Sequence, residues 1–373
     1  MTSDFGPSRS FFLLLALIAT TFATLLPAQS AEAVPKKFWG VHVFERPGAK
    51  DYKAMKKAGI GVVRMQIFWG NIEATPPNPD GSHNYNWAGP DAWMGTAAKA
   101  KVAVHGALYG TPAWLANDQS IAPVYSKRGR DSWRAFSRAV VNRYGRDGDF
   151  WDLHPELPVR PIKTYQIWNE QNSTARYKPA PDPEGYALLV DLASTQIRAV
   201  DKSAEVMLGG MFGTPFGCDS GSFCAWDFLD KLYKIDGFKK SFDTVAAHPY
   251  SPNLEGVKFQ MDEFHKALVR NGARNTPLAV TEIGWSSGKR REGNFFYQGV
   301  QGQAKLLDKA FKLFVKNERK WNISRVLWHA WRDPSTPITR CGACDKIGLV
   351  DQKLKHKPSY EAYKKYASRG GKK

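Results

Sequence analysis

Beyond its first 33 residues the sequence lacks any apolar run long enough to cross a bilayer, and it is poor in acidic residues. Asp and Glu number 35 against 53 Lys and Arg, which gives a formal net charge of +18. A field of this sign favours retention near anionic polymers, such as cell-wall polyanions or acidic polysaccharides. Nucleic acid is a poorer partner, because no zinc-finger, RNA-recognition or helix-turn-helix pattern is present. Many lysines, such as Lys53, Lys56 and Lys57, fall on amphipathic segments, where a solvated surface explains most of them.

A secretion signal is predicted for residues 1–33. Arg9 precedes an apolar run at 11–26, and small residues follow at 28–33. This order is typical of a cleaved signal peptide, whereas a membrane anchor needs about 20 apolar residues. We therefore expect a secreted, extracellular protein without stable membrane insertion. Residues 1–33 hold one basic and two acidic residues, a net −1, so their removal raises the charge from +18 to +19.

The four cysteines occur as two close pairs, Cys218 with Cys224 and Cys341 with Cys344. Export favours disulfides over bound metal. Three connectivities are possible for four cysteines, and pairing within each close pair is the simplest. A tetrahedral zinc site is the alternative, although the spacing is not that of a strong zinc finger.

Apolar runs alternate with amphipathic helical stretches from Phe38 onward, with no obvious break. Strands are predicted at 38–44, 62–69, 101–110, 164–170, 205–213, 242–251, 278–286 and 325–333. Helices are predicted at 131–144, 183–200, 256–271, 298–321 and 358–368, with Asp131 and Asp182 before two of them and Gly145 and Gly272 after two. Eight strands, each followed by a helix, predict an α/β fold of the single (β/α)8 (TIM) barrel type. A doubly wound sheet is the rival, but no glycine-rich phosphate loop follows the first strand. We expect one catalytic domain at 34–369 and a basic tail at 370–373.

Two glutamates end buried strands in this scheme. Glu170 closes the fourth strand, and Glu282 lies near the end of the seventh. Charged residues are rare at such places unless they are paired or used, and barrel enzymes carry their reacting groups at the carboxyl ends of strands. An ion pair with an arginine such as Arg64 is the structural alternative for either glutamate.

A pair of carboxylates suits the cleavage of glycosidic bonds. Retaining hydrolysis needs an ionised carboxylate that attacks the anomeric carbon and a protonated one that gives its proton to the leaving oxygen. The two groups must lie about 5 Å apart. A negative Glu282 would favour the protonated form of Glu170 until the sugar is attached, after which Glu170 would act as a base toward water.

The chain resembles retaining glycoside hydrolases of clan A, which include families five and thirty-nine. In those enzymes the acid/base glutamate follows an asparagine at strand four, as in Asn169-Glu170, and the nucleophile lies on strand seven, as Glu282 does. The resemblance covers essentially the whole chain after the signal segment. Apart from the resemblance, we expect Asn169 to donate a hydrogen bond to the sugar 2-hydroxyl, a contact that strengthens in the transition state.

The same resemblance assigns binding roles to further residues. Arg64, on the second strand, would hold the nucleophile ionised. His248 and Tyr250 end the sixth strand, where a similar His-x-Tyr pair lines the site and the tyrosine hydrogen-bonds the nucleophile. Trp328, with Trp331 as the second choice, matches the strand-eight tryptophan beneath the sugar.

The predicted protein is therefore a secreted, monomeric, retaining β-glycosidase that needs no metal or cofactor. Its substrate would be a plant or microbial wall polysaccharide or its oligosaccharides, and an anionic wall polymer is a possible further partner. A cell-wall transglycosylase is the first alternative. The others are a catalytically silent polysaccharide-binding barrel and a basic scaffold for acidic wall polymers.

Overall fold

The structure is a computed structural model that describes residues 1–3, 38–213, 218, 221–289, 294–338, 341 and 343–368. The described residues from 38 onward form one compact unit. The predicted signal segment, apart from residues 1–3, and the predicted basic tail at 370–373 lie outside the described residues. No helix among the described residues is both long and apolar enough to cross a membrane.

A single sheet of eight strands forms the centre of this unit. The strands are β1 (Trp39–His42), β2 (Val62–Phe68), β3 (Ala103–Tyr109), β4 (Thr164–Ile167), β5 (Glu205–Leu208), β6 (Val245–Ala247), β7 (Leu278–Ile283) and β8 (Ile323–Trp328). All the paired strands are parallel, in the order β5-β4-β3-β2-β1-β8-β7-β6. Bridges from Met207 to Thr244 and from Met211 to Ala247 join β5 to β6. These bridges bring the edges of the sheet together, so the predicted (β/α)8 barrel is confirmed and a doubly wound sheet is excluded.

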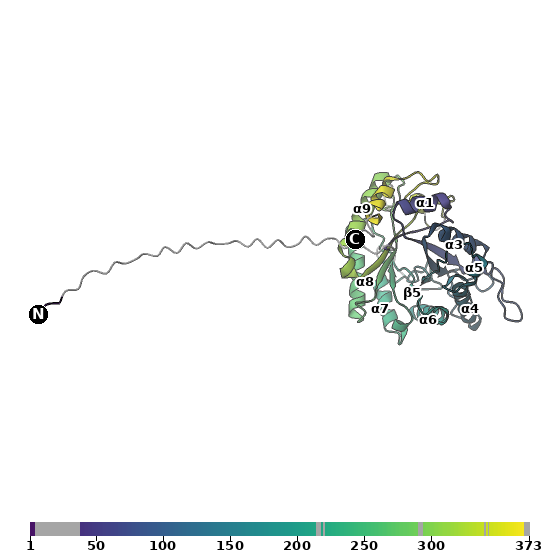
Figure 1. The fold of residues 1–373 in the computed structure, drawn as a ribbon. Helices are drawn as coiled ribbons and strands as arrows, with labels where there is room; N and C mark the ends of the chain where they lie inside the picture. The colour runs from purple at the N-terminus through teal and green to yellow at the C-terminus, as the bar shows by residue number, and fades with distance from the viewer. Residues whose placement is uncertain are drawn as a thin grey trace. The chain divides into compact units, whose positions relative to one another are not determined.

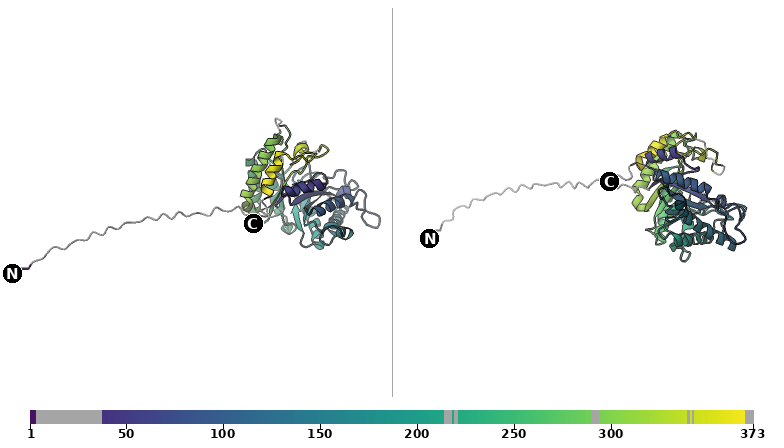
Figure 2. Two further views of the ribbon diagram at one scale, coloured as in Figure 1. Left: turned by 45° about the horizontal axis from the view of Figure 1, so that its top comes forward. Right: turned by 45° about the vertical axis from the view of Figure 1, so that its right-hand side comes forward.

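Helices surround the strands (Figures 1 and 2). They are α1 (Ala49–Lys57), α2 (Trp69–Ile72), α3 (Ala88–Ala100), α4 (Lys127–Tyr144), α5 (Asp149–Leu153), α6 (Pro183–Val200), α7 (Ala225–Tyr233), α8 (Leu254–Arg270), α9 (Gly299–Lys316), α10 (Glu318–Trp321) and α11 (Pro358–Ala367). Two 3-10 turns, η1 (Phe238–Lys240) and η2 (Cys344–Lys346), complete the set. Helices α9 and α11 pack side by side, and α11 contacts β1, where Tyr363 donates to the Gly40 carbonyl (Figure 2).

The starts of two helices test the predicted capping residues. Asp182 caps α6, because its carboxylate accepts a hydrogen bond from the Gly185 amide. The prediction for Asp131 is wrong, since α4 begins at Lys127 and its cap is Ser126, which accepts from the Gly129 amide. A serine followed by two basic residues is a weaker signal than an aspartate, although its hydroxyl serves equally well.

An ion pair crosses the barrel interior near the amino ends of the strands. Arg325 on β8 reaches across to Glu205 on β5 at 2.6 Å and to Thr164 on β4 at 2.9 Å. The two contacts show that the Arg325 side chain points into the barrel. Polar groups at the other end, where the strands finish, form the candidate site.

The fourth strand is shorter than predicted. It ends at Ile167, and the chain then turns through two left-handed residues, Trp168 (φ 70°) and Glu170 (φ 52°). The Glu170 amide donates to the Gly210 carbonyl at 2.9 Å, which fixes this turn against the end of β5. Glu170 therefore stands in a loop just above the barrel instead of ending a strand.

Candidate active site

Glu282 lies at the carboxyl end of β7 with both carboxylate oxygens hydrogen-bonded. Arg64 on β2 donates from Nη1 to Oε1 at 2.7 Å, and the Tyr250 hydroxyl donates to Oε2 at 3.0 Å. The arginine is fully buried, while the glutamate side chain keeps 8% of its surface exposed. A buried carboxylate with a guanidinium and a hydroxyl as donors is held in one orientation.

This environment fixes the charge of Glu282. Burial alone would raise the pKa of its carboxyl, but His248, His329 and Arg64 lower it, and the net result lies well below the usual value. Arg64 is the permanent cation among these groups. Burial raises the pKa of the Tyr250 hydroxyl well above its usual value, and neighbouring Glu282 adds to the effect. The tyrosine therefore stays protonated, and its hydroxyl donates a hydrogen bond to an ionised Glu282.

Arg64 also orients the residue that precedes the second glutamate. Its Nη2 donates to Asn169 Oδ1 at 2.7 Å, and its Nε donates to Gln166 Oε1 at 2.7 Å. Because the amide oxygen of Asn169 faces Arg64, the amide nitrogen is turned away from the guanidinium and is available as a donor. One arginine thus links β2, β4 and β7 and sets the geometry of three side chains.

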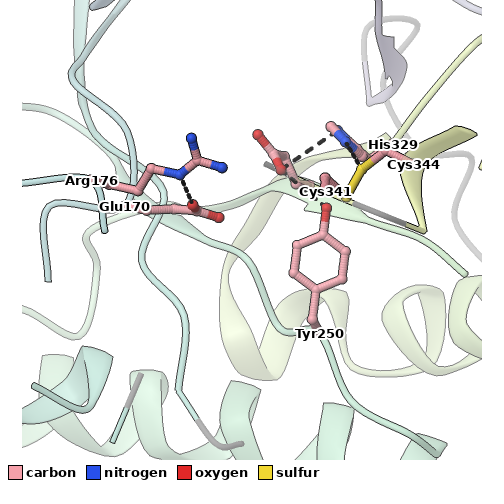
Figure 3. Close-up of a disulfide and its surroundings, with 7 residues drawn as sticks. Glu170, Arg176, Tyr250, His329, Cys341 and Cys344 are labelled. Carbon is pink, nitrogen blue, oxygen red and sulfur yellow. Dashed lines mark hydrogen bonds and ion pairs between the residues drawn. A yellow bond between two sulfur atoms is a disulfide. The ribbon is translucent and has the colours of Figure 1, made fainter. Parts of the chain in front are cut away.

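Glu170 faces Glu282 from the loop after β4. His248 Nδ1 lies 3.0 Å from Glu170 Oε1. Arg176 Nε donates to Glu170 Oε2 at 3.2 Å (Figure 3). The other ring nitrogen of His248 lies 3.0 Å from Thr281 Oγ1 and 3.7 Å from Glu282 Oε1. His248 therefore bridges the two glutamates. It is a buried residue of the site and not an isolated core histidine.

The separation of the carboxylates is that of a retaining glycosidase. One oxygen of Glu170, one oxygen of Glu282 and one ring nitrogen of His248 all lie within 4.8 Å of one another. Retaining enzymes hold their carboxyl groups about 5–5.5 Å apart, while inverting enzymes need roughly 6.5–9.5 Å for a water molecule between them. The nearest oxygens of the two carboxylates are thus closer than the spacing of inverting enzymes, which favours direct attack by Glu282.

The same three residues have donor atoms of the kind that bind a divalent metal. However, Arg64 lies on Glu282 and Arg176 lies on Glu170, so each carboxylate already has a cationic partner. A metal ion would have to displace or approach both guanidinium groups, which repel it. The donor set fits a metal poorly.

The structure corrects the prediction for the end of β8. Trp328 points outward, where its ring meets Phe311 of α9 and its indole nitrogen donates to the Ile347 carbonyl at 3.2 Å. Trp331 is also buried away from the glutamates, and its indole nitrogen donates to Asp51 at 2.8 Å. Neither tryptophan lies beside the reacting carboxylates, because side chains alternate along a strand and Trp328 occupies the outward position.

His329 takes the inward position instead. Its Nδ1 lies 3.5 Å from Glu282 Oε2, and its ring stacks on His42 with centroids 4.8 Å apart. The sequence analysis assigned no role to either histidine. Burial lowers the pKa of both imidazoles, so the stacked pair is neutral near neutral pH. Arg176 was missed as well, since nothing in the spacing of a polar loop marks it as a partner of Glu170.

Both predicted disulfides are present. Cys218 pairs with Cys224, and Cys341 pairs with Cys344, so local pairing is confirmed and the zinc alternative is excluded. The first bridge lies between β5 and α7. The second lies after β8, where Cys344 Sγ is 3.7 Å from His329 Nε2 (Figure 3). This bridge therefore contacts a side chain that contacts Glu282.

No protein-family profile matches the sequence, and no curated protein matches it. Solved structures do resemble the fold. A family 39 glycoside hydrolase from the gut symbiont Bacteroides cellulosilyticus has a TM-score of 0.65 and 19% identity, over 91% of this chain and 64% of that one. A monomeric β-xylosidase from Caulobacter crescentus has a TM-score of 0.61 and 18% identity, over 89% of this chain and 68% of that one. An intracellular xylanase from Thermoanaerobacterium saccharolyticum has a TM-score of 0.56 and 14% identity, over 88% of this chain and 98% of that one.

The chain spans less than two thirds of the first of these structures. At such identities the likeness shows the (β/α)8 fold, in agreement with the resemblance to clan A seen in the sequence. The chemistry of the chain rests on its own residues: Glu170, Glu282, Arg64, Asn169, His248 and Tyr250, which were all predicted from the sequence, come together in one site.

Proposed function

We propose that this chain is a retaining β-glycosidase that acts on a wall polysaccharide or its oligosaccharides. The observation that carries the proposal is the approach of the two carboxylates to within 4.8 Å at the carboxyl ends of the strands. The structural neighbours, which include a β-xylosidase and a xylanase, support a carbohydrate substrate. The predicted signal segment supports export, which makes the protein a secreted enzyme in this proposal.

In the first step the ionised Glu282 attacks the anomeric carbon of the sugar. The bond to the leaving oxygen breaks, and Glu170 gives that oxygen its proton. Arg64 and Tyr250 hold Glu282 in its ionised form and in one orientation until the attack. Asn169, with its amide oxygen on Arg64, presents its NH2 group to a sugar hydroxyl.

In the second step water attacks the anomeric carbon from the side that the leaving group vacated. Glu170 takes a proton from this water, and the bond between the sugar and Glu282 breaks. The product keeps the anomeric configuration of the substrate. Its release restores the ionised Glu282 and the protonated Glu170.

The roles are separated by chemical rescue with azide on an activated aryl glycoside. In Glu170→Ala the attached sugar is released by azide as a product of unchanged configuration. In Glu282→Ala azide attacks in place of the nucleophile and gives the inverted product. Glu45→Gln is the matched control, since Glu45 hydrogen-bonds Ser335 on the same side of the barrel and leaves both reacting groups alone.

Full activity in Glu170→Ala or Glu282→Ala would overturn the proposal. An inverted product from the unchanged enzyme would overturn the double displacement. A transglycosylase would instead form longer oligomers at high acceptor concentration, and a silent binding barrel would bind glycan with no release of sugar. The N-terminal sequence of the protein recovered from the culture medium tests export.

A further inference from the structure

Arg176 lies beside Glu170 in the site, but the general scheme of retaining hydrolysis assigns it no role. Its Nε donates to Glu170 Oε2 at 3.2 Å, and its side chain keeps 28% of its surface exposed. Among the described residues, no hydrogen-bond acceptor is found for its two terminal nitrogens. In Figure 3 these two nitrogens lie above the Glu170 carboxylate, and no dashed line joins them to a residue drawn. Half of the guanidinium fork therefore remains available.

The contact between Arg176 and Glu170 restricts which oxygen of the glutamate can hold the proton that an acid gives. A guanidinium only donates hydrogen bonds and stays charged throughout the working pH range. When Glu170 carries a proton on Oε2, the N–H of Arg176 has no acceptor there. An acceptor on the substrate, close to the leaving oxygen that Glu170 protonates, would then take this hydrogen bond.

Two other cations near the mouth of the barrel have carboxylate partners that take no part in the reaction. Lys178, on the same loop as Arg176, forms an ion pair with Asp118, and Arg332 forms one with Asp51. Arg176 differs from both, because its acidic partner is the reacting glutamate itself. No second carboxylate is paired with it among the residues that the structure describes.

We propose that Arg176 binds an acidic group, a carboxylate or a sulfate ester, on the sugar that leaves. The inference rests on the proposed function and names its substrate class: a β-glycan with an acidic unit next to the bond that is cut. The planar fork of Arg176 matches two anionic oxygens of such a group. When this group binds, it draws the guanidinium from Glu170 and frees Oε2 to hold the proton. The net charge of +18 also favours the approach of an acidic polymer.

The test uses acidic β-glycans and their neutral counterparts. The panel holds mannuronan, glucuronan and glucuronoxylan, each beside its carboxyl-reduced form, together with a sulfated β-glycan beside its desulfated form. We expect kcat/KM to be about 10- to 100-fold higher for one acidic polymer than for its neutral form, as a charge-assisted hydrogen bond provides. The glycan pair in which the acidic form is cut faster identifies the acidic group as a carboxylate or a sulfate ester.

Variants assign that preference to Arg176. Arg176→Gln should lose the preference for the acidic form while it still cuts the neutral form, and Arg176→Lys should restore part of it. The control is Arg128→Gln, which removes one charge at Trp114 without touching Glu170. Equal losses on acidic and neutral glycans in Arg176→Gln would overturn the inference, as would equal cleavage of both forms by the unchanged enzyme. Failure to cut any glycan would instead overturn the proposed function.

Discussion

Replacing Tyr250 by phenylalanine isolates the hydrogen bond that holds the proposed nucleophile. The change removes one oxygen, which donates to Glu282 Oε2 at 3.0 Å, and keeps the ring that packs against Phe296. A hydrogen bond to a charged group is worth about 1.5–3 kcal/mol. If this hydrogen bond stabilises the ionised Glu282 that attacks the sugar, its loss in Tyr250→Phe lowers kcat/KM by about 10- to 100-fold.

The same change should shift the pH profile of kcat/KM, and the charges around Glu282 determine the direction of the shift. The pKa of Glu282 lies well below its usual value, against the effect of burial, so any lost donor raises it. The rate falls as pH drops through the pKa of the nucleophile, because the protonated group cannot attack. The acidic limb of kcat/KM should therefore lie at higher pH in Tyr250→Phe than in the unchanged enzyme.

Tyr363→Phe is the matched control. Tyr363 on α11 is fully buried, and its hydroxyl donates to the carbonyl of Gly40 on β1 at 3.0 Å. It should lower the free energy of unfolding by about 1 kcal/mol without moving the pH profile. An acidic limb that stays in place in Tyr250→Phe, or that moves equally in Tyr363→Phe, would refute the reasoning.

Three further predictions follow from the contacts of the site. Arg64→Met should lower the free energy of unfolding by about 3–5 kcal/mol in denaturant titrations, because it leaves Glu282 buried without its cation. The same change should raise the pKa of Glu282. A variant with unchanged stability and an unchanged pH profile of kcat/KM would contradict this. Replacing both Cys341 and Cys344 by serine should lower kcat by about tenfold through His329, whereas serine at Cys218 and Cys224 should not. Prolonged treatment with a chelator should leave activity unchanged, since guanidinium groups already neutralise both carboxylates; recovery by an added divalent metal would count against the assignment.

The pairing of Arg64 with Glu282 shows why much of the site was predictable. Both residues lie on apolar strands, where a charge needs a partner or a use, and parallel strands bring their carboxyl ends to one rim. The sequence analysis offered two interpretations of Glu282, a structural ion pair and a catalytic group. The structure unites them, because the ion pair with Arg64 is what keeps Glu282 ionised.

The loop after β4 shows what the sequence could not provide. The run that ends in Glu170 suggests a continuous strand, but Trp168 and Glu170 adopt left-handed backbone conformations. Such conformations are uncommon outside glycine and depend on contacts made elsewhere, here the hydrogen bond from the Glu170 amide to Gly210. Arg176 escaped notice for the same reason, since only this turn brings the loop back over Glu170.

The error at β8 follows from the alternation of side chains along a strand. Arg325 points into the barrel, toward Thr164 and Glu205, so the inward positions of this strand are odd-numbered and Trp328 faces the helices. The inward residue at the rim is therefore His329. An indole there would offer an apolar face to a sugar, whereas an imidazole beside Glu282 offers ring nitrogens and a smaller surface. In the function proposed above, this polar wall near the nucleophile and Arg176 near the acid would recognise the substrate through polar and charged groups.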